Sequence, residues 1–481
     1  MTPNQQQWTR ESIKQLFRQS ADLKMERYEL GDADHWQPVF LLYCDGLAAT
    51  KHIDEVLRRL DIMINQEFGR ELDSRWNVSR VSETQKIVEL VFSGHLLLYL
   101  EKLDLVYALD ISSPPHRAVD ESNTEIAIKG PRDAFVEELD TNVALVRKRL
   151  RTNSLHYEQF SIGKRSQTKV ALLYIEDITQ PRFVEEARKR LQRLNLDILS
   201  SSSQLEELLA DRKITLFPLL HYTTRPDFVV DCLIRGRFAV LVDGAPTAII
   251  GPANLTLLLK TPEDGYIPFY MGTFGLWFRF AGLAIGLLLP GFWIAAASFN
   301  IEQIPYPLVA TISMSRIGLP LPAQLEGFLM MGLFELFREA SERLPKAVGQ
   351  TVAVVGGIVV GDAAIKAGLA STTFLVISSV TAVASFTLVN QSLVGAVTLI
   401  RLFVMLCSST LGMFGFILST IAIVVYLSTL ESFGVPYLSP LTPIRWKDFL
   451  SALVRKPWIL KNRRAEILET EDSTRQGEGG Q

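Results

Sequence analysis

The sequence FAGLAIGLLLPGFWIAAASF, residues 280–299, contains no charged side chain. A helix of about 20 apolar residues is long enough to cross the roughly 30 Å hydrocarbon core of a lipid bilayer. Further apolar blocks follow at residues 352–361, 369–388, 402–411 and 413–427. The sequence therefore predicts an integral, all-α membrane domain of about five or six helices within residues 270–432.

The region before the membrane block is rich in charge and is predicted to be soluble. The chain has 481 residues and a net charge of −3, and its six histidines all precede the membrane block. A nearly neutral chain without a basic groove is not typical of a nucleic-acid-binding protein. The polar start MTPNQQQWTRESIKQLF lacks the apolar segment of a signal peptide. We therefore expect the N-terminal region to lie in the cytoplasm.

Neither the cysteines nor any catalytic motif predicts an enzyme or a metal site. Cys44, Cys232 and Cys407 are odd in number and lack the paired spacing of a disulfide framework or a zinc site. The sequence contains no Gly-Lys-Ser/Thr phosphate loop, no His-Glu-x-x-His motif and no Gly-x-Ser-x-Gly elbow. We predict a protein that is not an enzyme and binds no metal or cofactor.

The soluble region contains one pattern twice: strand, helix, helix, glycine, hairpin. The first copy comprises residues 39–43 (VFLLY), 53–60, 85–92, Gly94 and 95–109, and the second comprises 170–174 (VALLY), 181–194, 228–234, Gly236 and 238–250. The two copies are offset by about 130 to 140 residues. This repeat predicts two similar small α/β modules, each burying one sheet face under helices. A chance match of short patterns is the alternative.

A basic helix is predicted between the modules. Gly130-Pro131 opens it, and four apolar side chains share one face: Phe135, Leu139, Val143 and Val146. Four cations follow at its end: Arg147, Lys148, Arg149 and Arg151. Cations at a helix C-terminus suit the helix dipole, so a solvated helix end is one interpretation. Docking to a partner or to anionic lipid headgroups is the other.

The segment PAQLEGFLMMGLFELFREASERL, which begins at Pro322, places charge within an apolar helix. Three carboxylates fall in one stripe beside Arg338, namely those of Glu335, Glu339 and Glu342, whereas Glu326 faces the opposite side. Carboxylates are costly against lipid, so the stripe is expected to face water, a basic partner or a subunit axis. In a symmetric oligomer, a ring of Glu335 side chains would favour cations in a pore. Alternatively, the helix only starts in the membrane and its end lies among the headgroups.

Other charges in the membrane block also have two interpretations. Asp362 and Lys366 are four residues apart on a helix and can pair, as a structural pair or as part of a permeation site. Arg279 and Arg401 are isolated beside apolar spans. Either can meet Glu326 across a helix interface or extend to a lipid headgroup.

Small residues predict close helix packing within the membrane. Gly282 and Gly286 are four residues apart, as are Gly357 and Gly361. This spacing puts the small residues on one helical face, where two backbones can approach closely. The proline-rich residues 304–322 are predicted to form a loop or a re-entrant element that neighbouring helices bury.

The chain after the last apolar block is basic, and the positive-inside rule places it in the cytoplasm. The complete division predicted from these patterns has six parts. They are an N-terminal arm, helical or disordered (1–36), a first α/β module (37–112), a linker with the basic helix (113–165), a second α/β module (166–260), the membrane domain (270–432) and a basic cytoplasmic tail (433–481).

With these motifs in view, the chain resembles the A subunit of GerA-type spore germination receptors from about residue 39 to residue 443. Four long motifs in the same order carry the resemblance. They are TEIAIKGPRDAFVEELDTNVALVRKRLR (124–151), TRPDFVVDCLIRGRFAVLVDGAPTAIIGPA (224–253), LEGFLMMGLFELFREASERLPKAVGQT (325–351) and ESFGVPYLSP (431–440).

The resemblance implies a protein of the spore inner membrane that works with a transporter-like B subunit, which holds the nutrient, and a lipoprotein C subunit. It also implies an oligomer, suspected to be a pentamer, that conducts cations when nutrient binds. Glu326, Glu335, Arg338 and Glu339 match a family motif. The chain departs from the family at Asp362, where a glutamine is common, and at Val389-Asn390, which replaces a proline-containing turn.

The residues and the resemblance together favour a channel-forming receptor subunit. A secondary transporter is the first alternative, with the proline-rich segment and Asp362 forming a binding site within the membrane. A non-conducting scaffold is the second, in which the soluble modules recruit partners and the membrane domain only anchors and oligomerises. The candidate intramembrane charges are Glu326, Glu335, Arg338, Glu339, Asp362, Lys366 and Arg401.

Overall fold

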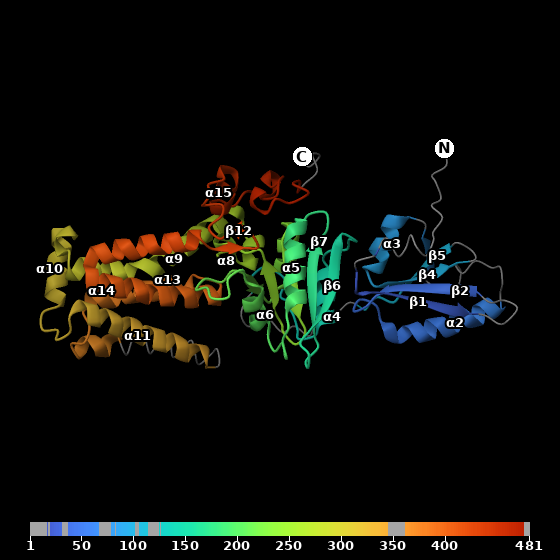
Figure 1. Ribbon diagram of the computed structural model, residues 1–481, viewed down its shortest axis with the longest axis horizontal. Helices are drawn as coiled ribbons and strands as arrows, with labels where there is room; N and C mark the ends of the chain where they lie inside the picture. The colour runs from blue at the N-terminus through green and yellow to red at the C-terminus, as the bar shows by residue number, and fades with distance from the viewer. Residues whose placement is uncertain are drawn as a thin grey trace.

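The computed structural model describes residues 17, 20–30, 37–66, 78–81, 83–101, 105–113, 125, 127–344 and 361–475. An α/β region forms one end and the middle of the elongated molecule, and apolar helices form the other end (Figure 1). The predicted fold class, an α/β N-terminal region followed by an all-α helical domain, is therefore confirmed.

The first module is a five-stranded antiparallel sheet with the strand order β1-β2-β4-β5-β3. Its strands are β1 (Leu23–Leu30), β2 (Gln37–Cys44), β3 (Val78–Val81), β4 (His95–Leu100) and β5 (Leu105–Asp110). Its helices are η1 (Thr50–His52), α2 (Ile53–Gln66) and α3 (Thr84–Val91). Strands β4 and β5 form the hairpin that the sequence predicts.

The second module repeats this topology with the strand order β6-β7-β9-β10-β8. Its strands are β6 (Leu155–Ile162), β7 (Thr168–Ile175), β8 (His221–Thr223), β9 (Phe238–Val242) and β10 (Ala248–Gly251). Its helices are α4 (Leu139–Arg147), α5 (Pro181–Arg193), α6 (Ser202–Leu209), α7 (Pro226–Ile234), α8 (Leu255–Leu258) and η3 (Pro262–Gly265). Each strand of the first sheet has a counterpart in the same place, so the two similar modules are confirmed.

Helices cover both faces of each sheet, and the prediction of one covered face per module is wrong. In β2, Leu42 packs in a core that includes α3, whereas its neighbour Leu41 packs in a core that includes α2. In β7, Leu172 packs in a core that includes α5, whereas its neighbour Leu173 packs in a core that includes α7. Figure 1 shows α2 and α3 on opposite sides of the first sheet. Uninterrupted apolar strands are typical of sheets buried on both faces.

Two edge strands occupy segments where the sequence predicts no strand. Strand β1 lies within residues 1–36, predicted as an arm, and β6 lies within residues 113–165, predicted as a linker. Both predictions are wrong for the described residues. Only Leu30 of β1 is buried, and charged side chains such as Glu26 and Arg27 interrupt the strand. Edge strands carry charge in this way, which hides the alternation that identifies inner strands.

Helix α4 begins at Leu139, well after the predicted start at Gly130-Pro131. The Asn142 side chain accepts a hydrogen bond from the Val136 amide at 2.8 Å and donates one to the Val136 carbonyl at 2.6 Å. The Phe135 amide donates to the Thr224 carbonyl at 2.8 Å. These bonds hold the preceding segment outside the helix.

The basic end of α4 is buried at Arg147, whose side chain is 0% exposed. Its Nε donates to Asp22 Oδ2 at 2.9 Å, and its Nη2 donates to Asp22 Oδ1 and Ser20 Oγ, each at 3.1 Å. The guanidinium carbon lies 4.3 Å from the centroid of the Phe92 ring. All three partners precede or belong to the first module, so α4 joins the modules. The predicted solvated helix end is wrong at this residue.

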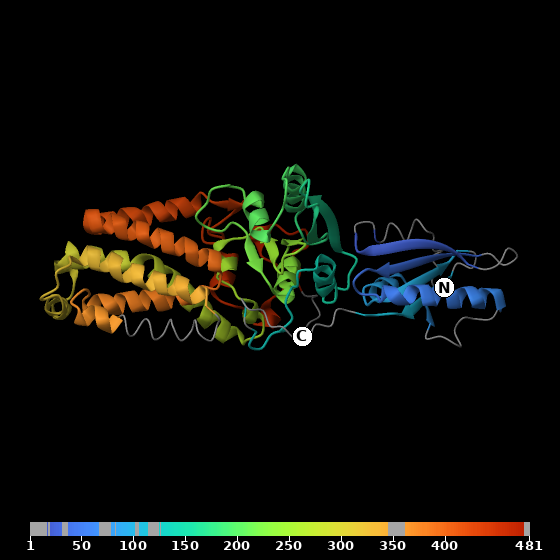
Figure 2. The same ribbon diagram turned by 90° about the horizontal axis from the view of Figure 1, so that it is seen from below.

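The helical domain contains α9 (Phe269–Ser298), η4 (Ile301–Gln303), α10 (Tyr306–Ser315), α11 (Ala323–Glu342), α13 (Thr372–Phe386) and α14 (Gln391–Ser428). Helix α14 is interrupted at Gly412, whose φ is +61°. The chain reverses there, and the two halves of α14 run along the same side of the bundle (Figure 2).

Helices α9 and α14 are long and apolar enough to cross a membrane. Only 22% of the most apolar window of α14 is buried within the molecule. A helix in the core of a soluble domain would not leave so much apolar surface exposed. Residues 345–360 lie outside the described residues, so the number of crossings stays a prediction.

The proline-rich segment, predicted as a loop or a re-entrant element that neighbouring helices bury, is largely exposed in the structure. It contains the helix α10, which lies across the end of the bundle farthest from the modules (Figure 1). Pro305 precedes this helix and Pro307 occupies its first turn, where a missing N–H is tolerated. Tyr306, Met314 and Ile317 are exposed. Neighbouring helices therefore do not bury the segment within the described structure.

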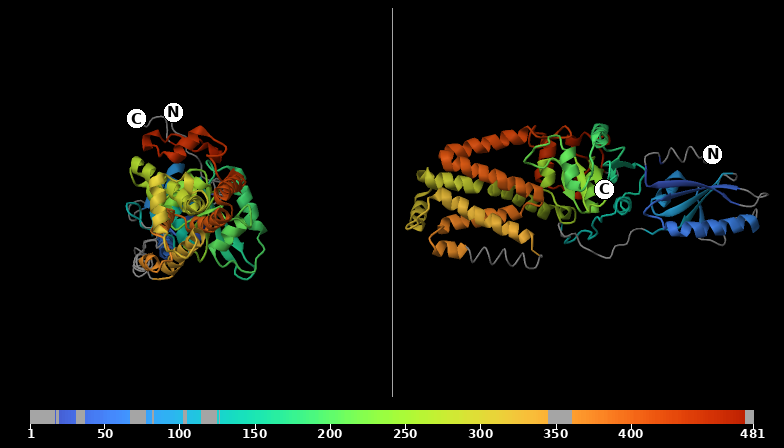
Figure 3. Two further views of the ribbon diagram at one scale, coloured as in Figure 1. Left: turned by 90° about the vertical axis from the view of Figure 1, so that its left-hand side faces the viewer. Right: turned by 60° about the horizontal axis from the view of Figure 1, so that its bottom comes forward.

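The C-terminal segment, predicted as a basic cytoplasmic tail, packs on the second module. Its elements are β11 (Glu431–Ser432), β12 (Val435–Pro436), α15 (Trp446–Leu453), η5 (Trp458–Leu460) and η6 (Glu466–Leu468). The Ser432 hydroxyl donates to the Leu219 carbonyl at 2.6 Å, and the Arg464 Nε donates to the Ile234 carbonyl at 2.8 Å. The right-hand view of Figure 3 shows this segment beside the second module.

Gly282 and Gly286 lie buried on α9 at helix contacts. A Cβ atom on Gly282 would lie 2.9 Å from the Ala384 carbonyl oxygen in α13, and one on Gly286 would lie 3.4 Å from Ser385 Oγ. On α11, the added Cβ of Gly332 would meet no atom within 4 Å. The close approach at Gly282 therefore depends on the missing side chain.

A Gly282→Leu substitution is expected to separate α9 from α13 and to destabilise the helical domain by about 1–3 kcal/mol. The thermal unfolding midpoint of the full chain in detergent measures this loss. Gly395→Leu is the matched control, because the added Cβ at Gly395 meets no atom within 4 Å. Equal midpoints for the two variants would contradict the packing role of Gly282.

Candidate functional site

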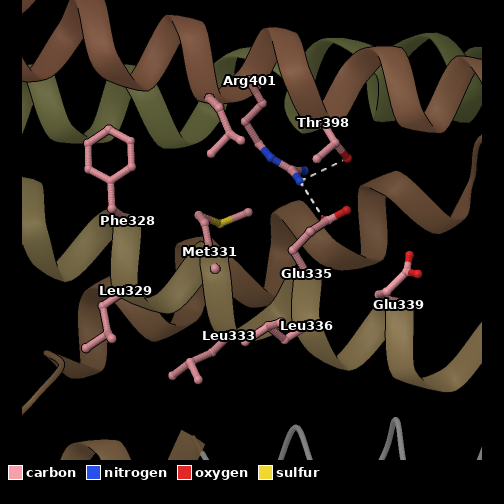
Figure 4. Close-up of a pocket in the computed structure, with 11 residues that line it drawn as sticks. Phe328, Leu329, Met331, Leu333, Glu335, Leu336, Glu339, Thr398 and Arg401 are labelled. Carbon is pink, nitrogen blue, oxygen red and sulfur yellow. Dashed lines mark hydrogen bonds and ion pairs between the residues drawn. The ribbon is translucent and has the colours of Figure 1, made fainter.

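A cavity of about 590 Å³ lies between α11 and the first half of α14. Most of its wall is apolar, and Glu335 on α11 faces Arg401 and Thr398 on α14 across it (Figure 4). The lining residues are Phe328, Leu329, Met331, Gly332, Leu333, Glu335, Leu336, Glu339, Thr398, Arg401 and Leu402. The site is thus a polar contact inside an apolar helix interface.

Helical spacing brings these groups together. Met331 and Glu335 are four residues apart on α11 and therefore lie on one face of that helix. Thr398 and Arg401 are three residues apart on α14, so they also share a face. Figure 4 shows the Glu335 and Arg401 side chains pointing toward each other from these two helices.

Arg401 is a desolvated cation whose side chain is 4% exposed. Its Nη2 lies 3.2 Å from Glu335 Oε2 and donates to Thr398 Oγ1 at 3.3 Å, and its Nη1 donates to Ser385 Oγ at 3.3 Å. Its Nε has no partner among the described residues. A buried cation is stable only while a carboxylate and hydrogen-bond acceptors surround it.

The Glu335 carboxylate is shared between two arginines. Arg338, one turn further along α11, donates from Nε to Glu335 Oε1 at 2.9 Å, while Arg401 occupies Oε2. Glu339 points away from this contact and pairs with Arg343 at 2.6 Å near the surface. The stripe predicted from the sequence is therefore divided: Glu335 is held by arginines on both sides, and Glu339 is exposed.

Glu326 lies at the far end of α11, and its residue surface is 0% exposed. Its Oε1 accepts hydrogen bonds from the Ser371 amide at 2.6 Å and from the Ser371 hydroxyl at 2.5 Å. Its Oε2 lies 3.7 Å from Arg316 Nη1. Ser371 caps the N-terminus of α13, so Glu326 joins α11 to that helix end. The sequence analysis allowed Glu326 to contact Arg279 or Arg401. In the structure, Arg279 pairs with Asp264 and Arg401 pairs with Glu335 instead.

The other predicted charges lie outside the cavity. Asp362 and Lys366 form the pair expected from their spacing, at 2.7 Å, and both side chains are exposed. Arg279, within α9, binds Asp264, which precedes this helix, at 2.7 Å. Gly361 is buried, and a Cβ on it would lie 3.2 Å from Leu375 Cδ1. Gly357 lies outside the described residues.

Asn390 connects the second module to the helix that carries Arg401. Its Oδ1 accepts a hydrogen bond from the Leu393 amide at 3.0 Å and so caps α14. Its Nδ2 therefore faces His221 Nδ1, at 3.2 Å. Burial and the neighbouring Arg237 lower the pKa of His221 to about 3, so the ring is neutral and Nδ1 can accept this bond.

Sequence analysis did not identify Arg316, Ser371 or His221 as part of any site. A signal existed for Ser371, because serine before an apolar helical run is a typical N-cap. Asn390 had the same signal, because asparagine before an apolar helical run is also a typical N-cap. No group of three or more metal-ligating side chains occurs in the described part of the chain.

Comparison with known proteins identifies a family. Residues 11–467 match the family model described as Bacillus/Clostridium GerA spore germination protein. The chain is 44% identical to spore germination protein XA of Bacillus anthracis over 395 residues, 82% of this chain and 80% of that protein. It is 34% identical to spore germination protein B1 of Bacillus subtilis (strain 168) over 476 residues, 97% of this chain and 98% of that protein.

A solved structure is also similar to part of the chain. The crystal structure of the N-terminal domain of the A subunit of the Bacillus megaterium spore germinant receptor GerK3 is 27% identical and aligns with a TM-score of 0.40. The alignment covers 50% of this chain and 92% of that chain.

Proposed function

Because this chain belongs to the GerA family of spore germination proteins, we propose that it is the membrane subunit of a nutrient germinant receptor that triggers spore germination. It works with the B and C subunits of that receptor, and copies of it form a nutrient-gated cation channel. The observation that carries the channel proposal is the Glu335–Arg401 pair beside a cavity in an apolar helix interface.

In the proposed resting state, the Glu335 carboxylate is neutralised and offers no site to a cation. Arg338 and Arg401 occupy both of its oxygens. A movement of α14 relative to α11 withdraws Arg401 and frees one carboxylate oxygen toward the cavity. Rings of acidic side chains favour cations in channels, so this change converts a closed site into a conducting one.

The proposed signal reaches the site through the second module. His221 holds Asn390, which caps α14, and Arg401 lies further along the same helix. A shift of the module therefore moves the helix end, and a rigid helix carries the displacement to Arg401. This proposal assigns the module a gating role and leaves nutrient binding to the B subunit.

The proposed assembly is a homo-oligomer, suspected to be a pentamer. Large apolar side chains on α11 and α14, including Leu336, Phe414 and Ile417, are exposed in the single chain. Contacts with further copies, partner subunits and lipid would cover them. The α/β modules and the basic C-terminal segment lie at the same end of the apolar helices (Figure 1). With the positive-inside rule, this favours a cytoplasmic location for both in the spore inner membrane.

A Glu335→Gln substitution tests the channel proposal. Removing the carboxylate leaves Arg401 buried and positive beside the ion path, so cation flux is expected to fall about tenfold or more, equivalent to about 1.4 kcal/mol. Flux is measured in liposomes containing the receptor subunits, with the oligomeric mass measured in parallel. The double variant Glu335→Gln, Arg401→Gln removes both charges and is expected to recover part of the flux.

The matched control is Glu302→Gln, which removes an exposed carboxylate beyond the end of α9 and is expected to leave flux unchanged. Unchanged flux in correctly assembled Glu335→Gln protein would count against a pore role for this carboxylate. Wild-type rings that conduct nothing, even with nutrient and partners, would favour a scaffold. Flux of a solute coupled to ions would favour a transporter.

A further inference from the structure

A second cavity, of about 810 Å³, lies where the second module, the first turns of α9 and the C-terminal segment meet. Its lining is rich in cations from all three parts of the chain: Arg235, Arg237, Lys260, Lys447, Arg455, Lys456, Lys461, Arg463, Arg464 and Arg475. Half as many carboxylates line it: Asp227, Asp231, Asp264, Asp448 and Glu466. We call this cavity the basic pocket.

Arginines already engage two of the carboxylates of the basic pocket, Asp231 and Asp264. Asp231 binds Arg235 at 2.5 Å and Arg475 at 3.2 Å. Asp264 binds Arg279, which belongs to α9 and is not part of the pocket wall, at 2.7 Å. These carboxylates are therefore not available to neutralise the remaining cations.

Two buried donor atoms in the basic pocket have no hydrogen-bond acceptor among the described residues. Arg237 is 6% exposed and forms no ion pair among the described residues, and its Nε donates to the Pro252 carbonyl at 3.0 Å. Arg235 Nε and Arg455 Nη1 are buried, and no atom of the described chain accepts a hydrogen bond from either. A buried donor without an acceptor is costly, so an acceptor from outside the chain would stabilise this arrangement.

Lys260 lies among these cations. Burial, followed by the repulsion of Arg235 and Arg237, lowers its pKa to about 7, and the attraction of Asp231 and Asp264 only partly opposes this shift. The lysine is therefore only partly charged near neutral pH in the chain alone. An anion beside it would favour the charged ammonium.

Apolar side chains flank the basic pocket on the membrane side. Gly272 and Leu276 of α9 line it, and Arg455 packs against Gly272, where an added Cβ would lie 2.9 Å from Nη1. Trp446 on α15 is 74% exposed beside it, and Tyr270 is exposed at the start of α9. Aromatic side chains gather at the level of lipid headgroups. The basic pocket is therefore placed where a lipid headgroup can enter it.

We propose that the basic pocket binds the phosphate group of an anionic phospholipid from the membrane that α9 enters. Phosphate oxygens accept several charge-assisted hydrogen bonds at once, which suits converging arginine and lysine donors. The cavity is large enough for a headgroup, and the aromatic side chains border the position of its acyl chains. Because the three parts of the chain meet here, a bound lipid also ties the C-terminal segment to the second module.

The test is lipid retention by the full chain. Protein in nanodiscs of phosphatidylcholine with added phosphatidylglycerol is transferred to detergent, and bound lipids are counted by native mass spectrometry. Wild-type protein is expected to retain phosphatidylglycerol in preference to phosphatidylcholine by about fivefold or more. Lys260→Met is expected to weaken retention about fivefold, and adding Arg455→Met to weaken it further. The control Lys189→Met, an exposed lysine on α5, is expected to have no effect.

Inorganic phosphate distinguishes the two sources of the anion. The proposal expects phosphate alone to raise the thermal midpoint of wild-type protein weakly, and less than phosphatidylglycerol does. A midpoint that responds to phosphate but not to the lipid would overturn the lipid source. Wild-type protein without a preference for phosphatidylglycerol would overturn the proposal, whether or not the variants fold. Equal retention by wild-type and folded Lys260→Met protein would also overturn it.

Discussion

Arg147→Met protein is expected to lose about 3–5 kcal/mol of the free energy that holds the first α/β module against the second. The substitution removes a side chain that is 0% exposed and leaves Asp22 buried without its cation. It also removes three hydrogen bonds to Asp22 and Ser20 and the contact with the Phe92 ring. Breaking one side of a buried ion pair costs more than breaking an exposed pair, because the remaining charge stays desolvated.

Limited proteolysis and thermal unfolding of the full chain measure the effect. We expect the first module to be released by protease much faster than in wild-type protein, and its unfolding to separate from that of the second module. Arg165→Met is the matched control, since its pair with Asp197 is exposed and should contribute less than about 1 kcal/mol. The additional substitution Asp22→Asn is expected to restore part of the stability. A loss no larger than that of the control would contradict the role of Arg147.

Glu326→Ala is expected to destabilise the helical domain by about 2–4 kcal/mol. The carboxylate accepts both the amide and the hydroxyl hydrogen bonds of Ser371, and the residue is 0% exposed. Its removal takes away the acceptor of the buried Ser371 amide and hydroxyl groups and weakens the cap of α13. Arg316 also loses the carboxylate that lies 3.7 Å from it.

A second substitution separates hydrogen bonding from charge. Glu326→Gln keeps an acceptor for Ser371 and is expected to lose only about half as much stability as Glu326→Ala. Thermal unfolding of the purified protein in detergent, followed by its helical circular dichroism, gives both values. Glu302→Ala, at an exposed carboxylate, provides the control. If all three variants unfold at the wild-type temperature, Glu326 does not stabilise the junction of α11 and α13.

The inner strands and helices of the modules could be predicted because their sequences are locally distinctive. Apolar runs such as VFLLY and VALLY favour buried strands, and the order of elements revealed the repeat. The edge strands β1 and β6 were missed because polar and charged side chains interrupt their apolar pattern, Glu26 and Arg27 in β1 and Glu158 and Gln159 in β6. The start of α4 was missed because the Asn142 side chain binds the backbone of Val136, a choice that composition does not reveal.

The candidate site was predictable as a helix face but not as a set of contacts. Helical spacing correctly separated Glu335 from Glu326, because position along one helix is a local property. Their partners depend on which helices lie opposite. Arg401 therefore reaches Glu335, and Glu326 reaches a helix cap at Ser371. The burial of Arg147 could not be predicted for the same reason. A cation at a helix end is ordinarily exposed, and Arg147 is buried only because the first module packs against it.

The position of α4 has a consequence for the order in which the chain folds during synthesis. Ala144 of α4 packs in the core of the first module, and Arg147 neutralises Asp22. Ala144 and Arg147 leave the ribosome only after every strand of the first sheet has emerged. Until then, the core of the first module lacks Ala144 and the Asp22 carboxylate lacks its cation. The first module is therefore expected to complete its core only together with the second module, which shares α4 with it.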